Sequence, residues 1–116
     1  MRFEDLEIWK NGMRLCVEIY NVFKNCKDFG FKDQIQRASV SIPSNIAEGF
    51  ERKSKKEYMH FLYIAKGSCG EVRTQLYLAI SIGLIDKSIG DELLKKSSNL
   101  SGMMGNFIKS HFNSIE

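Results

Sequence analysis

Four successive stretches of this chain carry apolar residues at the spacing of an α-helix, and only short polar breaks separate them. In the first stretch, steps of three and four residues link Leu6, Trp9, Met13, Cys16, Tyr20 and Phe23. Similar patterns follow over about residues 32–50, 54–82 and 86–108. The chain contains a single proline among 116 residues, whereas a β protein of this size needs many turn residues. The pattern therefore predicts an all-α fold.

The breaks carry signals that begin and end helices. Ser54 and Glu57 have the spacing of a capping box just before the third apolar stretch, and Gly83 is suited to a left-handed C-terminal cap. Asp86 is a plausible N-cap for the last helix. Because the link between these two helices is so short, they must pack antiparallel. We therefore expect an antiparallel up-down-up-down four-helix bundle, with residues 1–116 forming one domain.

Pro43 falls inside the second predicted helix. Proline removes the hydrogen bond to the carbonyl of Ser39 and its ring clashes with that carbonyl, so a bend is predicted there. The polar groups freed by such a bend need partners. We expect Asn45 and Glu48 to bond within or between helices near Pro43, and Arg52 to belong to the turn that follows.

Small residues predict one place of close helix packing. If the last two helices are antiparallel, Gly67 and Gly70 lie near the level of Gly102 and Gly105. Glycine costs a helix about 1 kcal/mol relative to alanine, so two facing pairs favour a close approach of the two backbones. The alternative is that these glycines only weaken their helices.

The first predicted helix is apolar over more of its circumference than one bundle core requires. A second stripe lies beside the first, and the two together cover roughly 220° at about 100° per residue. We expect this second stripe to contact another copy of the chain. The predicted oligomer interface consists of Ile8, Leu15, Ile19 and Val22.

Composition limits the remaining classes without choosing among them. A net charge of +3 and an isoelectric point near 8.8 permit a nucleic acid or acidic partner but do not require one. The cysteines at 16, 26 and 69 have no metal-ligand spacing, and their odd number argues against a disulfide framework. The N-terminal residues are too charged for a signal peptide, and no apolar run approaches the length of a membrane span. We therefore expect a cytoplasmic protein without membrane contact.

One pair of residues suggests metal chemistry. Glu57 and His60 have the Glu-x-x-His spacing of di-iron bundles, but such a site needs a second motif, and Ile108 stands three residues before the other histidine, His111. Serines are numerous around Pro43, yet none forms a nucleophile motif with histidine, and the chain has no glycine-rich phosphate loop. We predict no catalytic residue, no metal and no cofactor.

The most concentrated charge lies between the second and third helices. Four cations occupy this turn: Arg52, Lys53, Lys55 and Lys56. Cations are unfavourable at a helix N-terminus, where the macrodipole is positive, so their placement favours a role in binding phosphate. The alternative is a solvated surface loop.

The segment over residues 33–50, DQIQRASVSIPSNIAEGF, closely resembles the signature of the four-helix bundle proteins encoded in intervening sequences of bacterial 23S ribosomal RNA genes. The resemblance extends to the FEDL segment near the start with Trp9, to Arg52, to the helix start at 54–61, and to IAKGS followed by Glu71. It covers nearly the whole chain, although the last helix matches only loosely.

This resemblance implies a ring of five bundles and no enzymatic activity. It also implies a relationship to the accessory protein of diversity-generating retroelements, which binds a reverse transcriptase and nucleic acid. We therefore expect a non-enzymatic homo-oligomeric scaffold, a pentamer, that binds RNA or DNA, or a protein that handles nucleic acid, through its basic surface. The alternative is a helical module that binds only protein.

Overall fold

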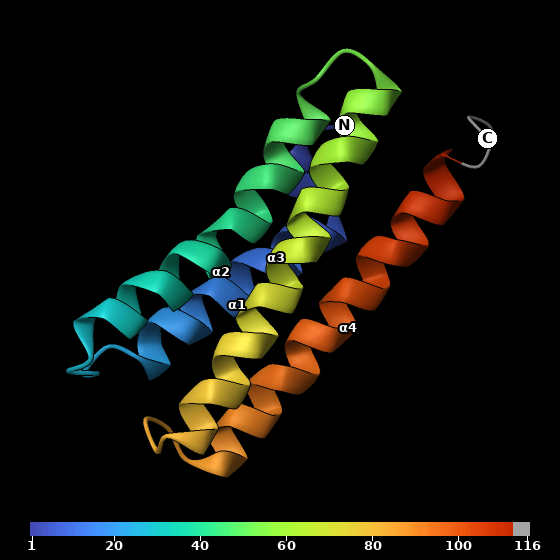
Figure 1. Cartoon of the computed structure of the whole chain (residues 1–116). Coiled ribbons are helices and arrows are strands. Elements are labelled where there is room, and N and C mark those ends of the chain that lie inside the picture. Colours follow the sequence, from blue (N-terminus) through green and yellow to red (C-terminus); the bar gives the residue numbers. More distant parts are fainter. Residues whose placement is uncertain (113–116) are drawn as a thin grey trace.

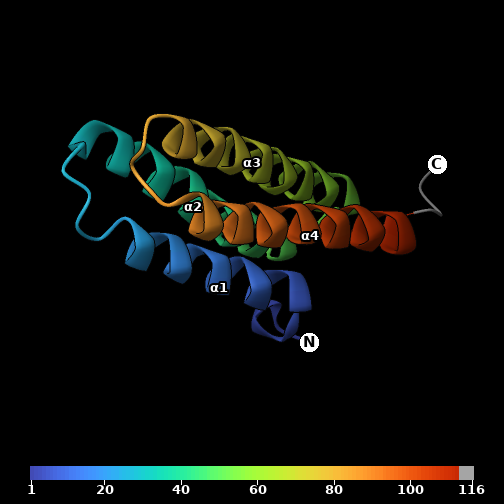
Figure 2. The same ribbon diagram turned by 90° about the horizontal axis from the view of Figure 1, so that it is seen from below.

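The computed structural model of the chain describes residues 1–112, which fold into one short 3-10 turn and four long helices. These are η1 (Phe3–Asp5), α1 (Glu7–Val22), α2 (Phe29–Phe50), α3 (Lys55–Ser81) and α4 (Lys87–Phe112). Successive helices run in opposite directions and lie side by side (Figures 1 and 2). The molecule is a rod with principal extents of 46 × 20 × 19 Å. The predicted all-α four-helix bundle is confirmed.

Local signals in the sequence set the boundaries of α3. The Ser54 hydroxyl accepts a hydrogen bond from the Glu57 amide at 3.0 Å, which satisfies one free donor of the first turn. At the other end Gly83 has a φ of +77°, and the Leu84 amide donates to the Ala79 carbonyl at 2.8 Å. Together with the bond from the Gly83 amide to Ile80, this is a Schellman cap. Both predicted ends of α3 are confirmed.

The first two helices differ from the expected bounds. A separate turn, η1, precedes α1, which ends at Val22, so Leu6 and Phe23, the two ends of the predicted apolar stripe, lie outside the helix. Phe23 leaves the helical conformation and packs against Phe31, with their ring centroids 5.6 Å apart. Helix α2 begins three residues earlier than expected because the Asp28 carboxylate accepts from the Phe31 amide at 3.1 Å. Asp28 is therefore an N-cap that was not predicted from the sequence.

All four helices contribute to one core. The fully buried large side chains include Ile19, Ile35, Ile42, Ile46, Leu62, Val72, Leu76, Leu100 and Met104. Each lies on the face of its helix that turns toward the other three, as the periodic pattern predicts. Burial of this continuous apolar surface is the main stabilising contribution to the fold.

Pro43 is buried inside α2, which continues through it from Phe29 to Phe50. Opposite Pro43, Gly12 brings α1 close, since a Cβ at Gly12 would lie 3.6 Å from the proline nitrogen. The Asn45 side-chain amide donates to the Ser41 carbonyl at 2.7 Å and to its hydroxyl at 3.0 Å, as expected for a partner near the proline. The bend itself stays a prediction.

The predicted glycine contact between α3 and α4 is wrong. A Cβ at Gly67 or Gly102 would meet no atom within 4 Å, so these two positions are open instead of facing a helix. The glycine of α4 that lies closest to α3 is Gly90, where a Cβ would be 2.5 Å from the Ile80 side chain. On α2, a Cβ at Gly49 would lie 2.8 Å from the Phe61 Cβ. Antiparallel order sets which glycines lie level, but not the rotation of each helix about its axis.

Candidate functional site

The turn between α2 and α3 is held by Arg52. Its guanidinium donates to the Glu48 carboxylate one turn back on α2, and lies 3.6 Å from a carboxylate oxygen of Glu57 on α3. It also lies over the Phe61 ring, 4.8 Å from the centroid. Arg52 therefore joins two helices and its charge is balanced, so it differs from the other cations of the predicted basic site.

The three lysines of this turn have no such partners. Lys53, Lys55 and Lys56 are exposed, and within residues 1–112 none of them forms an ion pair or a side-chain hydrogen bond. We call this set the lysine turn. Lys55 and Lys56 occupy the first turn of α3, where the helix dipole disfavours them.

A cluster of aromatic rings packs next to the lysine turn. Tyr58 makes edge contacts with Phe50, Phe107 and Phe112, at centroid distances of 5.9, 6.2 and 5.4 Å. Burial raises the pKa of Tyr58 to about 12. These rings bring together the end of α2, the start of α3 and the end of α4, so the turn joins helix ends that are packed against one another.

Glu57 and His60 are not brought together with further ligands. The Glu57 carboxylate lies beside Arg52, while His60 is exposed and makes an edge contact with Phe61. Among the described residues no three His, Cys, Asp or Glu side chains are placed to hold a metal ion.

The predicted oligomer interface on α1 needs correction. Ile8, Leu15 and Ile19 are at most 3% exposed, and Val22 is half-buried against the core. Helix α1 is covered from two sides by α2 and α4, and this stripe lies between those two contacts. The structure therefore places Ile8, Leu15 and Ile19 inside the chain's own core, where they cannot contact a second copy, and leaves only part of Val22 accessible.

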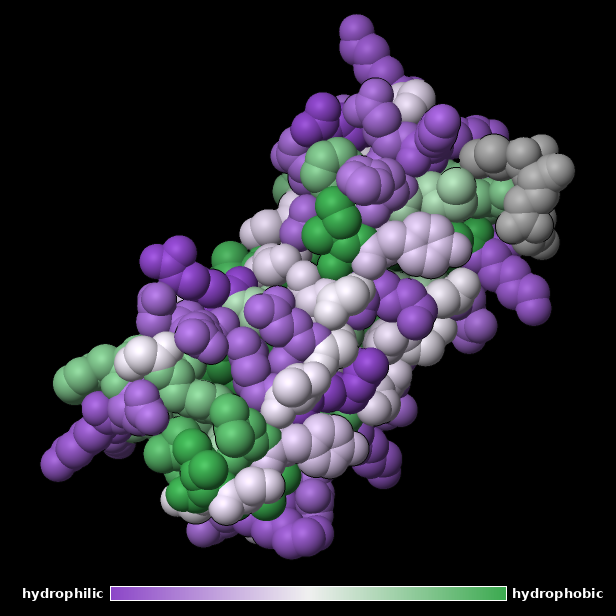
Figure 3. All heavy atoms as spheres, in the orientation of Figure 1, coloured by the Kyte–Doolittle hydropathy of each residue, from purple (hydrophilic) through white to green (hydrophobic). Residues whose placement is uncertain are grey.

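Exposed apolar residues lie elsewhere, on the outer faces of α1 and α3. On α1 they form a short ridge of Met13, Val17 and Tyr20. On α3 they form two groups, Tyr63 with Ile64 near its start, and Tyr77, Leu78 and the C-cap Ile82 at its end. Figure 3 shows green side chains gathered on this side of the molecule near the turn from α3 to α4. We call the group at the end of α3 the α3 apolar face; its residues are 49–61% exposed, compared with 38–53% for the ridge on α1.

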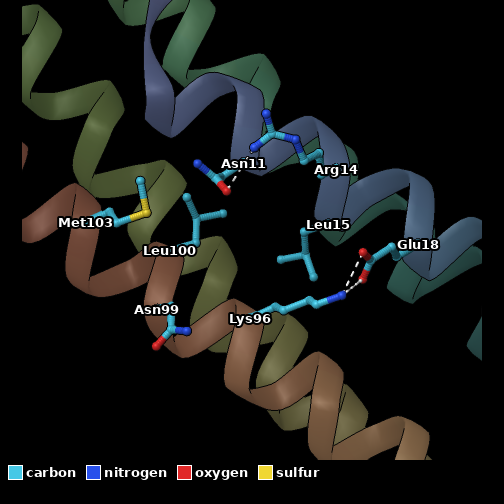
Figure 4. A pocket seen from close by; sticks show the side chains of 8 residues that line it. All are labelled: Asn11, Arg14, Leu15, Glu18, Lys96, Asn99, Leu100 and Met103. Carbon is cyan, nitrogen blue, oxygen red and sulfur yellow. Dashed lines mark hydrogen bonds and ion pairs between the residues drawn. The ribbon is translucent and has the colours of Figure 1, made fainter.

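A hollow of about 240 Å³ opens between α1 and α4. Leu15 and Leu100 point into it from the two helices, and Lys96 reaches across to Glu18 with Nζ–O distances of 2.8 and 2.9 Å (Figure 4). This hydrogen bond raises the pKa of Lys96. Arg14 lies at the same hollow and donates to Asn11 at 3.2 Å. Of the residues at this hollow, the sequence pattern singled out only Leu15, and as part of an oligomer interface.

The three cysteines lie apart from these sites. Cys69 is fully buried, and burial raises the pKa of its thiol to about 11. The Cys16 thiol lies 3.5 Å from the Ser39 hydroxyl inside the bundle, while Cys26 is half-buried. A thiol with a raised pKa is a poor nucleophile, so Cys69 packs as a small apolar residue.

No helix within residues 1–112 combines the length and the apolar character needed to cross a bilayer. None of the curated proteins matches the sequence. A solved structure from Bacteroides thetaiotaomicron, described as a protein of unknown function from the S23 ribosomal protein family, matches with a TM-score of 0.83 and 24% identity. The match covers 88% of this chain and 98% of that one, and it supports the fold.

The family comparison covers nearly the same length. The family described as 23S rRNA-intervening sequence protein matches residues 4–106, which include all of α1, α2 and α3 and most of α4. Neither that description nor the solved structure names a catalytic activity. The chain belongs to the family of 23S rRNA-intervening sequence proteins.

Proposed function

We propose that this protein is a non-enzymatic homo-oligomeric scaffold of the cytoplasm that binds nucleic acid through the lysine turn. The observation that carries the proposal is the set of three exposed ammonium groups without ion-pair partners within residues 1–112, at Lys53, Lys55 and Lys56. The family's description in terms of 23S rRNA supports RNA as the nucleic acid.

The arrangement suits contact with phosphates and not with bases. Lysine is a flexible point charge, so three of them in one turn recognise charge density without reading a sequence. Arg52 holds the two flanking helices together and leaves the lysines available. Binding of this kind releases counterions and depends strongly on salt.

An oligomer would repeat the lysine turn in each chain and so increase the number of phosphates contacted at once. We place the interface on the α3 apolar face, which includes Tyr77 and Leu78, because its apolar residues are more exposed than those of the ridge on α1. The family resemblance favours a ring of five. Light scattering after size exclusion measures the mass. Tyr77→Glu with Leu78→Glu should give a smaller species. Val40→Glu, at an exposed position of α2, is the control and should keep the wild-type mass. A monomeric wild-type protein contradicts this part of the proposal.

The salt dependence of binding to a short RNA duplex tests the lysine turn. Replacing Lys53, Lys55 and Lys56 with glutamine should weaken binding and reduce the slope of log affinity against log salt, by up to about 0.9 for each lost phosphate contact. The matched control replaces three other exposed lysines, Lys24, Lys27 and Lys95. If both variants behave alike, binding depends only on net charge and the lysine turn is a solvated loop.

A second candidate function, a helical module that binds only protein, is favoured by a different observation. The hollow between α1 and α4 has an apolar floor and lies away from the lysine turn. Nucleic acid binding does not use it.

A further inference from the structure

The hollow between α1 and α4 is one part of a longer groove. A second hollow of about 270 Å³ shares Glu18 and Lys96 with the first, and a third of about 290 Å³ shares Val22 and Ile89 with the second. The three hollows therefore follow the α1–α4 seam from Met103 to the turn between α3 and α4. On α4 this is about 18 residues, or roughly 27 Å at 1.5 Å per residue. We call it the α1–α4 groove.

The groove has an apolar floor and apolar walls. Leu15, Leu93 and Leu100 form the floor, and each is at most 3% exposed. Accessible apolar atoms come from the walls, where Ile89 is 41% exposed and Val22 and Met103 are half-buried. The lining is most apolar in the hollow between Leu15 and Leu100, and Leu84 and Ile85 join it near the α3–α4 turn.

The charges along the groove are ordered. Near Met103 the lining carries Arg14, between the amides Asn11 and Asn99. Midway, Glu18 and Lys96 neutralise one another across the seam (Figure 4). Near Ile89 the lining carries Glu92 and Asp86, and the cation that shares the hollow with Glu92 is Lys96, which already pairs with Glu18. The groove is therefore positive at one end, neutral in the middle and negative at the other.

We propose that the α1–α4 groove binds an amphipathic helix of another protein, with acidic residues in the helix's first turn over Arg14 and basic residues in its last turn over Glu92. The proposal concerns a different surface from the lysine turn and does not depend on nucleic acid binding.

Charge complementarity and helix physics agree on this occupant and on its direction. A seam between two packed helices accepts a third helix in its groove, with apolar residues at i, i+4, i+7 and i+11 as anchors. Acidic residues stabilise the N-terminus of a helix and basic residues the C-terminus. The partner helix therefore runs parallel to α1, and an apolar residue lies over the neutral pair of Glu18 and Lys96.

Two designed peptides of about 18 residues, matching the groove length, test the proposal. Both carry leucines at the four anchor spacings and the same hydrocarbon staple, so that their helicity is equal. One has glutamates in its first turn and lysines in its last turn, and the other has these charges exchanged. Fluorescence anisotropy should show that the wild-type protein prefers the first peptide by about tenfold, since two exposed ion pairs become repulsive in the second.

Exchanging two charges in the protein provides the decisive test of the proposal. Arg14→Glu with Glu92→Lys should reverse the preference between the two peptides, while the net charge of the protein stays the same. The matched control is Arg37→Glu with Glu71→Lys, which exchanges charges across the hollow between α2 and α3. This control should keep the wild-type preference.

Three outcomes overturn the proposal: no binding of either peptide at about 100 µM, equal affinity for both, or a preference that the Arg14 and Glu92 exchange leaves unchanged. A spin label at the N-terminus of the preferred peptide determines the direction in which the peptide binds. In NMR spectra of the protein it should broaden the amide signal of Arg14 more than that of Glu92. Loss of RNA binding in the lysine-turn variant leaves these results unaffected, so the two proposals fail separately.

Discussion

The seam between α2 and α3 and the seam between α1 and α4 are packed in opposite ways. In the first, Gly49 lets the backbone of α2 approach Tyr58 and Phe61, and the hydroxyls of Ser41 and Ser68 lie 2.7 Å apart. In the second, three linked hollows follow the contact, compared with a single hollow at Arg37 and Glu71 in the first, within residues 1–112. An exposed ion pair spans the second seam. The size of the side chains at each contact explains the difference, because small residues allow helices to approach and long polar residues hold them apart.

The contrast divides the bundle into a closed side and an open side. The closed seam carries the turn with Arg52 and the aromatic cluster, so the lysine turn has a rigid support. The open seam exposes parts of its apolar lining, which is the property of a binding surface. Substitutions at each seam therefore test whether the two seams differ in how closely they are packed.

The largest effect is expected at Gly49. In Gly49→Ala the new Cβ would lie 2.8 Å from the Phe61 Cβ and 3.1 Å from the Tyr58 carbonyl oxygen, and neither atom can move without shifting α3. Overpacking costs about 1–3 kcal/mol, and the higher helix propensity of alanine offsets at most about 1 kcal/mol of that. We expect the free energy of unfolding, measured in urea, to fall by up to about 2 kcal/mol.

Gly49→Val should be more destabilising still, because its two further methyl groups enter the same contact. Ser44→Ala, at an exposed position of the same helix, is the control and should leave stability within about 0.5 kcal/mol of wild type. If Gly49→Ala is as stable as wild type, α2 and α3 can move apart at little cost, and the seam between them is not closely packed.

Much of the fold could be predicted because helix formation depends on local signals. Ser54 and Gly83 mark their helix ends through bonds to residues nearby in the chain, and the apolar period fixes the number of helices. The rotation of each helix depends on how all four pack together. The arc of α1 could therefore be recognised as wide, but the pattern did not show that Ile8, Leu15 and Ile19 lie at its buried centre.

The candidate sites illustrate the same limit. The basic turn could be found because its cations are adjacent in sequence, but only the fold separates Arg52, which is paired, from the three lysines. The α1–α4 groove joins residues 78 positions apart, such as Glu18 and Lys96. The only sequence signal for it was a charged residue of each sign on helices that the bundle topology makes neighbours.

A smaller effect of opposite sign is expected at Gly67. A Cβ there would meet no atom within 4 Å, so Gly67→Ala adds helix propensity without a clash. We expect a gain of about 0.5–1 kcal/mol in the free energy of unfolding. Thermal denaturation followed by circular dichroism, at a concentration where light scattering shows the same mass for both proteins, measures it. A loss of stability would indicate that a second copy packs against this part of α3.

The smallest effect is expected at the ion pair that spans the open seam. The side chains of Lys96 and Glu18 are 45% and 38% exposed, so solvent screens their attraction. A double-mutant cycle with Lys96→Gln and Glu18→Gln should give a coupling energy smaller than the effect of Gly67→Ala. About 1 M NaCl, where the Debye length is about 3 Å, should remove this coupling.

Because Glu18 raises the pKa of Lys96 above its ordinary 10.5, the contribution of the ion pair to stability is present at neutral pH and is lost as pH rises beyond that value. Ser68→Ala removes a hydroxyl from the closed seam and supplies the comparison, since its cost should not change with salt. If the Lys96–Glu18 coupling persists in high salt, water does not reach the pair, and the seam between α1 and α4 is as closed as the one between α2 and α3.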